Sequence, residues 1–245
     1  MKRVLIVGAD SAIVGETAKL FAAAQAELYL TGLNTDKLDA LAQDLRVRGA
    51  SKVITAKFDA LEFSSHAQML KNALASLGDL DVAFIGYGSL PDQKRCEALY
   101  ENTEREFKLN CLSVISLLTL ISNKMEEARK GCIVVISSPA GDRGRQSNYV
   151  YGAAKGALSI FLSGLRNRLS AKGVHVLTVK PGFVSTPMTA HLKQGLLYVG
   201  PERVARDIFG AIQKEKNILY TPWFWQYIMF IIKHIPEFLF KKLKL

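Results

Sequence analysis

Short apolar runs alternate with longer helix-like segments along most of the chain, and this alternation restricts the possible folds more than any other feature. The runs have the length and side chains of buried strands, whereas the segments between them are long enough for helices. This pattern is typical of an α/β protein in which right-handed crossovers build a parallel sheet with helices on both faces. The predicted strands, about seven in all, are residues 3–7, 27–31, 52–58, 82–85, 133–136, 174–179 and 218–221. The first predicted helix runs to about residue 24, and the others cover residues 36–48, 64–77, 103–129, 151–170 and 201–214.

Length and composition favour one folded domain. The chain has 245 residues, of which 49% are hydrophobic and 22% charged, so it can bury a full core and is not expected to be disordered. The cysteines at positions 96, 111 and 132 are far apart, which predicts reduced thiols. The apolar run from Val4 to Val7 is too short for the core of a signal peptide, and we expect a cytoplasmic protein. The four histidines are scattered, so no metal site is expected.

A glycine-containing turn follows the first predicted strand and leads directly into a helix. Gly8 begins this turn, and Ser11 and Ile13 lie within it. A strand, turn and helix in this order can present backbone N–H groups and a helix N-terminus to a pyrophosphate. Ala12 and Val14 stand where small residues, usually glycine, would let the backbone approach a nucleotide. The turn taken alone is therefore a weak signal of dinucleotide binding.

The end of the second predicted strand bears on the form of the nucleotide. An acidic residue there would bind the adenosine ribose of NAD, but residues 31–34 are uncharged and Asp36 comes a little late. The missing acid favours NADP(H) over NAD(H), although no arginine marks a 2′-phosphate. Asp59 follows the third strand, where it could accept a hydrogen bond from an adenine amino group or simply close a turn. Gly88, after the fourth strand, permits backbone beside a cofactor.

Ser138, Tyr151 and Lys155 form the strongest chemical pattern in the chain. Ser138 ends the apolar run 133–136, and the tyrosine and lysine are four residues apart on one helix face. A nearby ammonium favours the phenolate, and a hydroxyl can hold a substrate oxygen beside the phenol. Such a set can protonate a carbonyl that gains a hydride, or deprotonate an alcohol that loses one. The spacing alone is equally compatible with an ordinary helix pair.

The motifs together resemble the short-chain dehydrogenase/reductase superfamily over roughly residues 3–221. The resemblance rests on Ser138 with the run Tyr151 to Lys155, on residues 181–186 (PGFVST), on Asn110 and on Asp59. It implies a Rossmann-type, doubly wound parallel sheet and NAD(P)-dependent oxidoreductase chemistry. It further implies that Tyr151 is the general acid/base and that Ser138 orients the substrate oxygen.

The same resemblance assigns the remaining site residues. Lys155 would lower the pKa of the tyrosine and bind the nicotinamide ribose, and Asn110 would hold a water in a proton relay to that lysine. Val184 and Thr186 would contact the nicotinamide carboxamide. Nine residues are implied to bind the cofactor: Gly8, Ser11, Ile13, Asp59, Gly88, Tyr151, Lys155, Val184 and Thr186.

The chain departs from the family pattern in two places. The usual Gly-x-x-x-Gly-x-Gly reads Gly8, Ala12 and Val14, and the usual Asn-Asn-Ala-Gly reads Ile85-Gly86-Tyr87-Gly88. Alanine is a mild change, but Val14 is expected to disturb the packing of the helix on the strand. Cofactor affinity could fall as a result, whereas the intact catalytic residues argue for an active enzyme.

A narrower resemblance concerns the substrate. Residues 140–149 (AGDRGRQSNY) and 220–225 (YTPWFW) are similar to decaprenylphosphoryl-2-keto-ribose reductases. This implies a keto-sugar carried on a polyprenyl phosphate. Arg143, Arg145, Gln146 and Tyr149 are then the candidate substrate residues, with the arginines as a clamp on an anionic group. Solvated loop charge, or a salt bridge across a subunit interface, is the other interpretation of the two arginines.

The C-terminal segment 222–245 is predicted to lie outside the α/β domain of residues 1–221. Residues 217–232 carry no charge, and six lysines stand against two glutamates between positions 214 and 245. The uncharged run falls short of the ~20 residues that a membrane-spanning helix needs. Aromatic side chains flanked by lysines favour an anchor at an anionic membrane surface, here the inner face of the cell membrane. A substrate lid or a dimer contact are the alternatives.

These patterns lead to one preferred function and its rivals. We expect an NADP(H)-dependent enzyme that interconverts a ketone and a secondary alcohol, on a lipid-linked sugar or on a small soluble ketone, steroid or acyl substrate. The rival is a non-catalytic NAD(P)-binding protein at the membrane. Nucleic-acid binding is not expected despite a net charge of +10, because the basic excess lacks a reading element. Helices 103–129 and 151–170 suggest a homodimer or higher homo-oligomer, by analogy alone.

Overall fold

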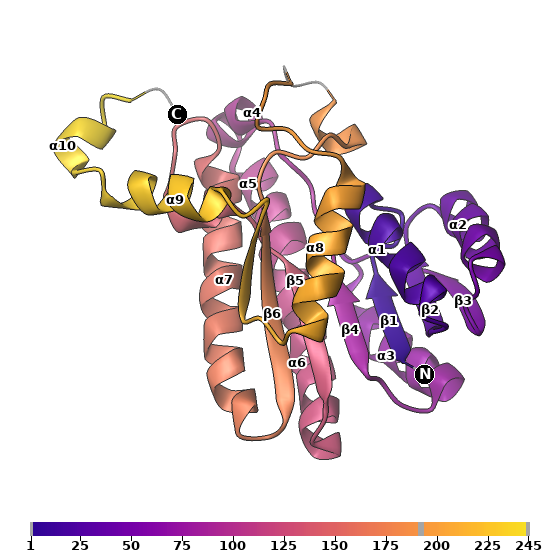
Figure 1. The fold of residues 1–245 in the computed structure, drawn as a ribbon. Coiled ribbons are helices and arrows are strands. Elements are labelled where there is room, and N and C mark those ends of the chain that lie inside the picture. The colour runs from indigo at the N-terminus through magenta and orange to yellow at the C-terminus, as the bar shows by residue number, and fades with distance from the viewer. Residues whose placement is uncertain (1, 191–193, 244–245) are drawn as a thin grey trace.

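The predicted strands form one parallel sheet in the computed structural model, which describes residues 2–190 and 194–243 (Figure 1). The strands are β1 (Arg3–Val7), β2 (Glu27–Gly32), β3 (Lys52–Lys57), β4 (Val82–Ile85), β5 (Gly131–Ile136), β6 (Val174–Pro181) and β7 (Ile218–Thr221). Their order in the sheet is β3-β2-β1-β4-β5-β6-β7. The expectation of a doubly wound α/β sheet is therefore confirmed.

The strand order reverses between β1 and β4, and this reversal opens a crevice at the carboxyl edge of the sheet. β1 pairs with β2 on one side and with β4 on the other, so that Val7 lies beside both Thr31 and Ile85. Because the crossovers on the two sides of β1 run in opposite directions, the loops after β1 and β4 separate there. A ligand site is expected at this point of the fold.

Helices cover both faces of the sheet, because side chains alternate along each strand. Residues 5, 7, 83 and 85 pack against one helical layer, and residues 4, 6, 82 and 84 against the other. The first layer consists of α3 (His66–Leu77), α6 (Ser113–Ala128) and α7 (Tyr149–Ser170). The second consists of α1 (Ala12–Ala23), α2 (Thr35–Val47) and α8 (Pro201–Gln213). In both layers the apolar side chains that face the sheet are buried, for example Leu117 in the first layer and Phe21 in the second.

The predicted helix 103–129 is interrupted. The structure has α5 (Tyr100–Phe107), a π-helical turn over Lys108–Leu112, and then α6, and it adds the short helix α4 (Gln93–Ala98) before them. The spacing of apolar residues in the sequence does not reveal a π-helical turn, which contains one residue more than an α-helical turn. π-turns are frequent at functional sites, and this one carries Asn110 into the buried interior.

The C-terminal segment forms two short helices, α9 (Trp225–His234) and α10 (Glu237–Phe240). Both extend from the end of the molecule at which β7 finishes, beside the amino-terminal end of α7 (Figure 1). Pro236 separates them and serves as the residue before α10. Among the described residues, none of the helices has both the length and the apolar character needed to cross a membrane.

Candidate active site

A cavity of about 540 Å³ opens at the switch point of the sheet. Its walls come from the turn after β1 and from the carboxyl ends of β2, β4, β5 and β6, together with the first turns of α7. All nine residues expected to bind a cofactor line it: Gly8, Ser11, Ile13, Asp59, Gly88, Tyr151, Lys155, Val184 and Thr186. Ser138 lines the same cavity, so the structure brings three predicted catalytic residues, Ser138, Tyr151 and Lys155, together with the predicted nucleotide-binding residues.

The turn after β1 is held close to its neighbours. Gly8 has a φ of +88°, and a Cβ at this position would lie 2.7 Å from Tyr87 Cβ, so a side chain is excluded both by conformation and by space. The N–H groups of Gly8 and Ala9 both donate to the carbonyl of Thr31, at 2.8 and 2.9 Å. Ser11 precedes α1 and makes no capping hydrogen bond with its side chain. Its hydroxyl and the first N–H groups of α1 therefore remain suited to a phosphate.

Val14 does not disturb the packing, contrary to the expectation from the sequence. It is fully buried, and a Cβ added at Gly86 would overlap its Cγ2 atom. The valine thus occupies space that the glycine leaves, so the two departures from the family pattern complement each other. Sequence reasoning treated them separately, because positions 14 and 86 lie on different elements.

Tyr87 is a second residue of the stretch after β4 that departs from the family pattern. Its backbone and Cβ lie against Gly8, and its hydroxyl is 2.9 Å from Ser113 Oγ on α6. Burial raises the pKa of the Tyr87 phenol, whereas the Ser113 hydroxyl lowers it. The tyrosine stays neutral and acts as a packing residue between the turn and the helix.

Ser138 is positioned by the turn that follows β5. Its Oγ accepts a hydrogen bond of 3.1 Å from the N–H of Ala140, which caps the 3-10 turn Pro139–Asp142. Two glycines of α7 let the helix touch this turn. A Cβ at Gly152 would lie 2.8 Å from the Ala140 carbonyl oxygen, and one at Gly156 would lie 2.9 Å from that of Gly141. This close contact brings Tyr151 of α7 towards Ser138, which follows β5.

Tyr151 and Lys155 occupy successive turns of α7 in a buried environment. The lysine Nζ lies 5.8 Å from the centre of the tyrosine ring and donates to the Ile136 carbonyl at 3.2 Å. Burial raises the pKa of Tyr151 to about 12, while the Ser138 hydroxyl lowers it. Burial lowers the pKa of Lys155 to about 8, against a small raising effect of Cys111. Burial is thus the larger cause for both groups, and the phenol is protonated at neutral pH.

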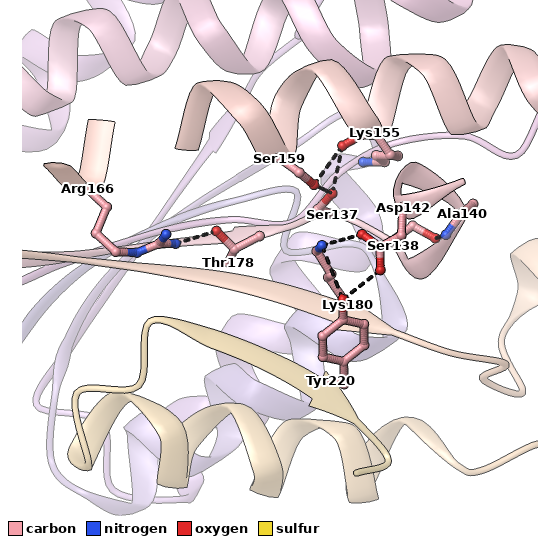
Figure 2. Close-up of polar contacts among 10 residues, drawn as sticks. All are labelled: Ser137, Ser138, Ala140, Asp142, Lys155, Ser159, Arg166, Thr178, Lys180 and Tyr220. Atoms are coloured by element: carbon pink, nitrogen blue, oxygen red, sulfur yellow. Dashed lines mark hydrogen bonds and ion pairs between the residues drawn. The ribbon is translucent and has the colours of Figure 1, made fainter. Parts of the chain in front are cut away.

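A small hydroxyl cluster fixes the turn of α7 that carries Lys155. Ser137 Oγ donates to the Lys155 carbonyl at 3.1 Å and lies 2.8 Å from Ser159 Oγ, which also donates to that carbonyl at 2.8 Å (Figure 2). Ser137 directly follows β5 and precedes Ser138. The strand end is thus tied to the helix independently of the catalytic side chains.

A buried ionic cluster fixes the other side of the Ser138 turn. Asp142 forms an ion pair with Lys180 of β6 and accepts a 2.6 Å hydrogen bond from the Tyr220 hydroxyl of β7 (Figure 2). The Asp142 carboxylate raises the pKa of the Tyr220 phenol, after burial as the larger cause. Sequence reasoning missed this cluster, since its three members come from three separate elements and no spacing links them.

Asn110 is fully buried beside the cavity and does not line it. Its Oδ1 accepts from the Ser89 N–H at 3.2 Å, and its Nδ2 donates to Glu106 Oε2 at 3.0 Å. A Cβ at Gly88 would lie 2.6 Å from Asn110 Oδ1 and 3.4 Å from Lys155 Nζ. The amide oxygen and the ammonium therefore flank the same glycine.

The four candidate substrate residues separate into two groups. Arg145 lines the cavity, its Nε is buried without a hydrogen-bond partner in the described part of the chain, and burial lowers its pKa. Arg143, Gln146 and Tyr149 do not line the cavity. Gln146 donates to the Leu243 carbonyl at 3.3 Å, and Tyr149 is exposed at the start of α7.

Arg143 binds the C-terminal segment instead of a substrate. Its Nη1 donates to the carbonyls of Ile232 at 2.6 Å and Ile235 at 2.7 Å, at the end of α9. Its Nη2 pairs with Glu237 at 2.9 Å, and its Cζ lies 3.6 Å from the centre of the Phe240 ring. The prediction of an anion clamp is wrong for this residue, because carbonyls that end a helix already hold the guanidinium.

The C-terminal segment also contributes a wall of the cavity. Trp225 is buried and lines it, and the indole takes the space that a Cβ at Gly182 would need. Its ring packs edge-on against Phe183, with centres 4.8 Å apart. The predicted boundary after residue 221 therefore divides one structural unit, since the first turn of α9 belongs to the site.

Two further residues near the end of β2 line the cavity and were not expected there. They are Asp10, from the turn after β1, and Lys37, from the first turn of α2. A Cβ at Gly32 would lie 2.7 Å from Asp10 Oδ1. The sequence feature that could have indicated Asp10 is Gly32, because a glycine at the end of β2 leaves room for a side chain from another element.

The fold and the site define a class before any comparison with other proteins. A switch-point cavity, a turn with close backbone approach and a serine–tyrosine–lysine set fit a nicotinamide dinucleotide, and they make the chain a dinucleotide-binding α/β oxidoreductase. The family model described as short chain dehydrogenase matches residues 2–196. The chain therefore belongs to the short-chain dehydrogenase/reductase family.

Individual relatives agree with this family. An uncharacterised oxidoreductase of Mycobacterium tuberculosis is 35% identical over 240 residues, which are 98% of this chain and 96% of the relative. A 3-oxoacyl-[acyl-carrier-protein] reductase of Chlamydia muridarum is 30% identical over 195 residues, 80% of this chain and 79% of the relative. Among solved structures, a short-chain dehydrogenase/reductase from Burkholderia phymatum in complex with NAD has a TM-score of 0.83 at 21% identity. That match covers 93% of this chain and 91% of the other.

Proposed function

We propose that this enzyme reduces a ketone to a secondary alcohol, and catalyses the reverse oxidation, with a bound nicotinamide dinucleotide. The observation that carries the proposal is the convergence of Ser138, Tyr151 and Lys155 on the cavity that also holds the turn after β1. Such a constellation is suited to proton transfer at a carbonyl oxygen. The cofactor, when bound, supplies or accepts the hydride.

The residues of the chain then have distinct tasks. The Ser138 hydroxyl holds the substrate oxygen, and Tyr151 donates its proton to that oxygen during reduction. Its raised pKa keeps the phenol in the proton-donating form at neutral pH. The ammonium of Lys155 binds the ribose hydroxyls as a charged donor. Asn110 supports a relay through water to this lysine, because its Oδ1 and the lysine Nζ flank the same glycine.

For the substrate, we favour a keto-sugar linked to a polyprenyl phosphate. Arg145 supports this choice, since its Nε is buried and has no hydrogen-bond partner among the described residues, and a guanidinium is suited to an anionic oxygen near the reacting carbon. An acyl substrate is the second candidate. It is favoured by apolar lining residues such as Leu90 and Met188, and by the relative named as a 3-oxoacyl-[acyl-carrier-protein] reductase.

The experiment is a substrate panel with the purified chain. Transfer of deuterium from labelled reduced cofactor would be measured for a polyprenyl-phosphate-linked keto-pentose, free keto-sugars, a 3-oxoacyl thioester and a small ketone. We expect the lipid-linked keto-pentose to have the highest kcat/KM, and Arg145→Gln to reduce that preference. A higher kcat/KM with the thioester would overturn the sugar assignment. Failure to bind either nicotinamide dinucleotide would overturn the function itself.

We also propose that the C-terminal helices bind an anionic membrane surface at the inner face of the cell membrane, as a peripheral contact. Large apolar side chains are exposed on and around them, namely Trp223, Tyr227, Phe230, Ile231, Phe238, Leu239 and Leu243. The exposed lysines 233, 241 and 242 flank this group, which we call the tail face. Aromatic and basic side chains in this arrangement are typical of interfacial binding. A membrane contact here would present a lipid-linked substrate close to Trp225.

The form of the nicotinamide cofactor depends on the end of β2. The expected preference for NADP(H) rested on the absence of an acid in that strand, and it stays a prediction from sequence. The carboxylate of Asp10, from the turn after β1, lies beside Gly32 at this strand end. Lys37 is the cation of the cavity wall nearest in sequence to this strand end.

A further inference from the structure

The carboxylate of Asp10 takes the place of the side chain that β2 lacks at its carboxyl end. Gly32 ends the strand, and a Cβ built on it would lie 2.7 Å from Oδ1 and 2.9 Å from Cγ of Asp10. The backbone N–H of Asn34 donates to Asp10 Oδ2 at 3.4 Å, which further holds the carboxylate at the strand end. A carboxylate thus stands where the end of β2 could have supplied one, although it comes from the turn after β1.

This position lies in the cavity wall. Asp10, Gly32 and Leu33 all line the cavity, on the side of the turn after β1, and Asp59 lines it after β3. In a doubly wound fold, the pyrophosphate lies at the turn after β1 and the adenosine ribose lies at the end of the second strand. The Asp10 carboxylate therefore faces the place where a ribose 2′-oxygen would lie.

Charge decides what the carboxylate can accept. A ribose 2′-hydroxyl can donate a hydrogen bond to an ionised carboxylate. A 2′-phosphate brings close to two negative charges to the same oxygens, and like charges in contact are unfavourable. Lys37 provides opposite charge, but its side chain is exposed on the first turn of α2, and an exposed ion pair contributes little.

We propose that Asp10 selects NAD(H) against NADP(H), so that the acid for the adenosine ribose comes from the turn after β1. This rests on the proposed function, since it assumes that the cavity binds a nicotinamide dinucleotide. The acid and the glycine should therefore be coupled: a side chain at Gly32 fits only where Asp10 has been shortened.

The test is a binding titration, which needs no substrate. Dissociation constants of NADH and NADPH would be measured by fluorescence for the wild type, Asp10→Asn and Asp10→Ser. Displacement of NADH by 5′-AMP and by adenosine 2′,5′-bisphosphate isolates the ribose subsite. Asp36→Asn is the matched control, because this acid lies in the first turn of α2 and does not line the cavity.

We expect the wild type to bind NADH at least about tenfold more tightly than NADPH, a difference of about 1.4 kcal/mol. Asp10→Asn should remove most of this difference, mainly by improving NADPH binding, and Asp36→Asn should leave it unchanged. Asp10→Ser combined with Gly32→Asp should restore the preference for NADH. Equal or tighter binding of NADPH by the wild type would overturn the inference, as would an unchanged ratio in a folded Asp10→Asn. Absence of binding by both dinucleotides would instead contradict the proposed function.

Discussion

At the scale of single residues, Val14 and Gly86 are a complementary pair at the switch point. The valine methyl fills the space over the glycine, so Gly86→Ala should cost about 1–3 kcal/mol of unfolding free energy through overpacking. Val14→Ala removes the overlapping methyl. The double variant should therefore be more stable than the sum of the two single effects, by about 1 kcal/mol. Urea denaturation of the three variants measures this coupling.

The control for this cycle is a pair without contact. Ile160→Ala on the exposed side of α7 should combine additively with Gly86→Ala. Additive effects for positions 14 and 86 would show that the valine does not depend on the glycine.

The lowered pKa of Lys155 leads us to expect a pH dependence of cofactor binding. Burial lowers the pKa of Lys155 to about 8, so its ammonium is charged below this pH and becomes neutral above it. Because the charged form is the better donor to ribose hydroxyls, affinity for the dinucleotide should fall as the pH rises through about 8. Titrations between about pH 6 and pH 10 would show the fall, because this range includes the lowered pKa of Lys155. Lys155→Met should bind weakly and without this dependence; a pH-independent affinity in the wild type would contradict the assignment.

At the scale of elements, the turn 139–143 connects the catalytic strand to the C-terminal helices. Asp142 ties it to β6 and β7, and Arg143 ties it to α9 and α10. The guanidinium donates hydrogen bonds to two carbonyls at the end of α9. Carbonyls at a helix end have no partner within the helix and would otherwise bind water. The wall formed by Trp225 is therefore held by the same turn that places Ser138.

Removal of this contact should loosen the C-terminal helices. Arg143→Ala should lower the free energy of local opening of residues 225–240 by about 1–3 kcal/mol, because hydrogen bonds to a charged donor are lost. Amide hydrogen exchange would report faster exchange there, and kcat/KM should fall as the Trp225 wall loosens. Glu237→Gln is the matched control, since it removes only an exposed ion pair and should behave almost as the wild type. Unchanged exchange in Arg143→Ala would show that the arginine does not hold the helices.

Local order in the chain explains which parts of the site could be predicted. Ser138 follows β5, and Tyr151 and Lys155 lie on α7, the next α-helix along the chain, so their meeting depends on short-range structure. Asp10 and Trp225 are different, because the residues that they contact in the cavity wall, Gly32 and Gly182, are far from them in the sequence. The π-turn at Asn110 and the contacts of Arg143 depend on packing between elements, which periodicity does not report.

At the scale of the whole molecule, the parallel sheet and its two helical layers could be predicted, because the alternation of apolar runs and amphipathic segments determines them. The predicted boundary after residue 221 does not separate the C-terminal segment from the site, since Trp225 in the first turn of α9 is part of the cavity wall. The homodimer through the outer faces of α6 and α7 stays a prediction. The tail face leaves large apolar side chains exposed at the end of the molecule that carries the cavity, which calls for a covering surface.

Vesicle binding tests whether that surface is a membrane. The wild type should sediment with vesicles that contain phosphatidylglycerol, and less with pure phosphatidylcholine, because lysines meet the anionic lipid at about 1 kcal/mol each. Phe230→Glu with Ile231→Glu should abolish sedimentation, whereas Ile160→Glu, an exposed apolar position on α7, should leave it intact. Sedimentation of the double variant to the wild-type extent would exclude the tail face. A dimer that dissociates in this variant, without vesicle binding by the wild type, would assign the face to a second copy.

The central claim is that Tyr151 transfers the proton while the rest of the cavity binds the cofactor. Tyr151→Phe keeps the ring and removes only the hydroxyl, so it should lower kcat at least about 10²-fold, the typical contribution of a general acid. The dissociation constant of the cofactor should stay within about twofold of the wild-type value, a difference of about 0.4 kcal/mol. The measurement is the rate of ketone reduction at saturating cofactor, followed by nicotinamide absorbance and paired with a fluorescence titration. Undiminished turnover in Tyr151→Phe would contradict the account.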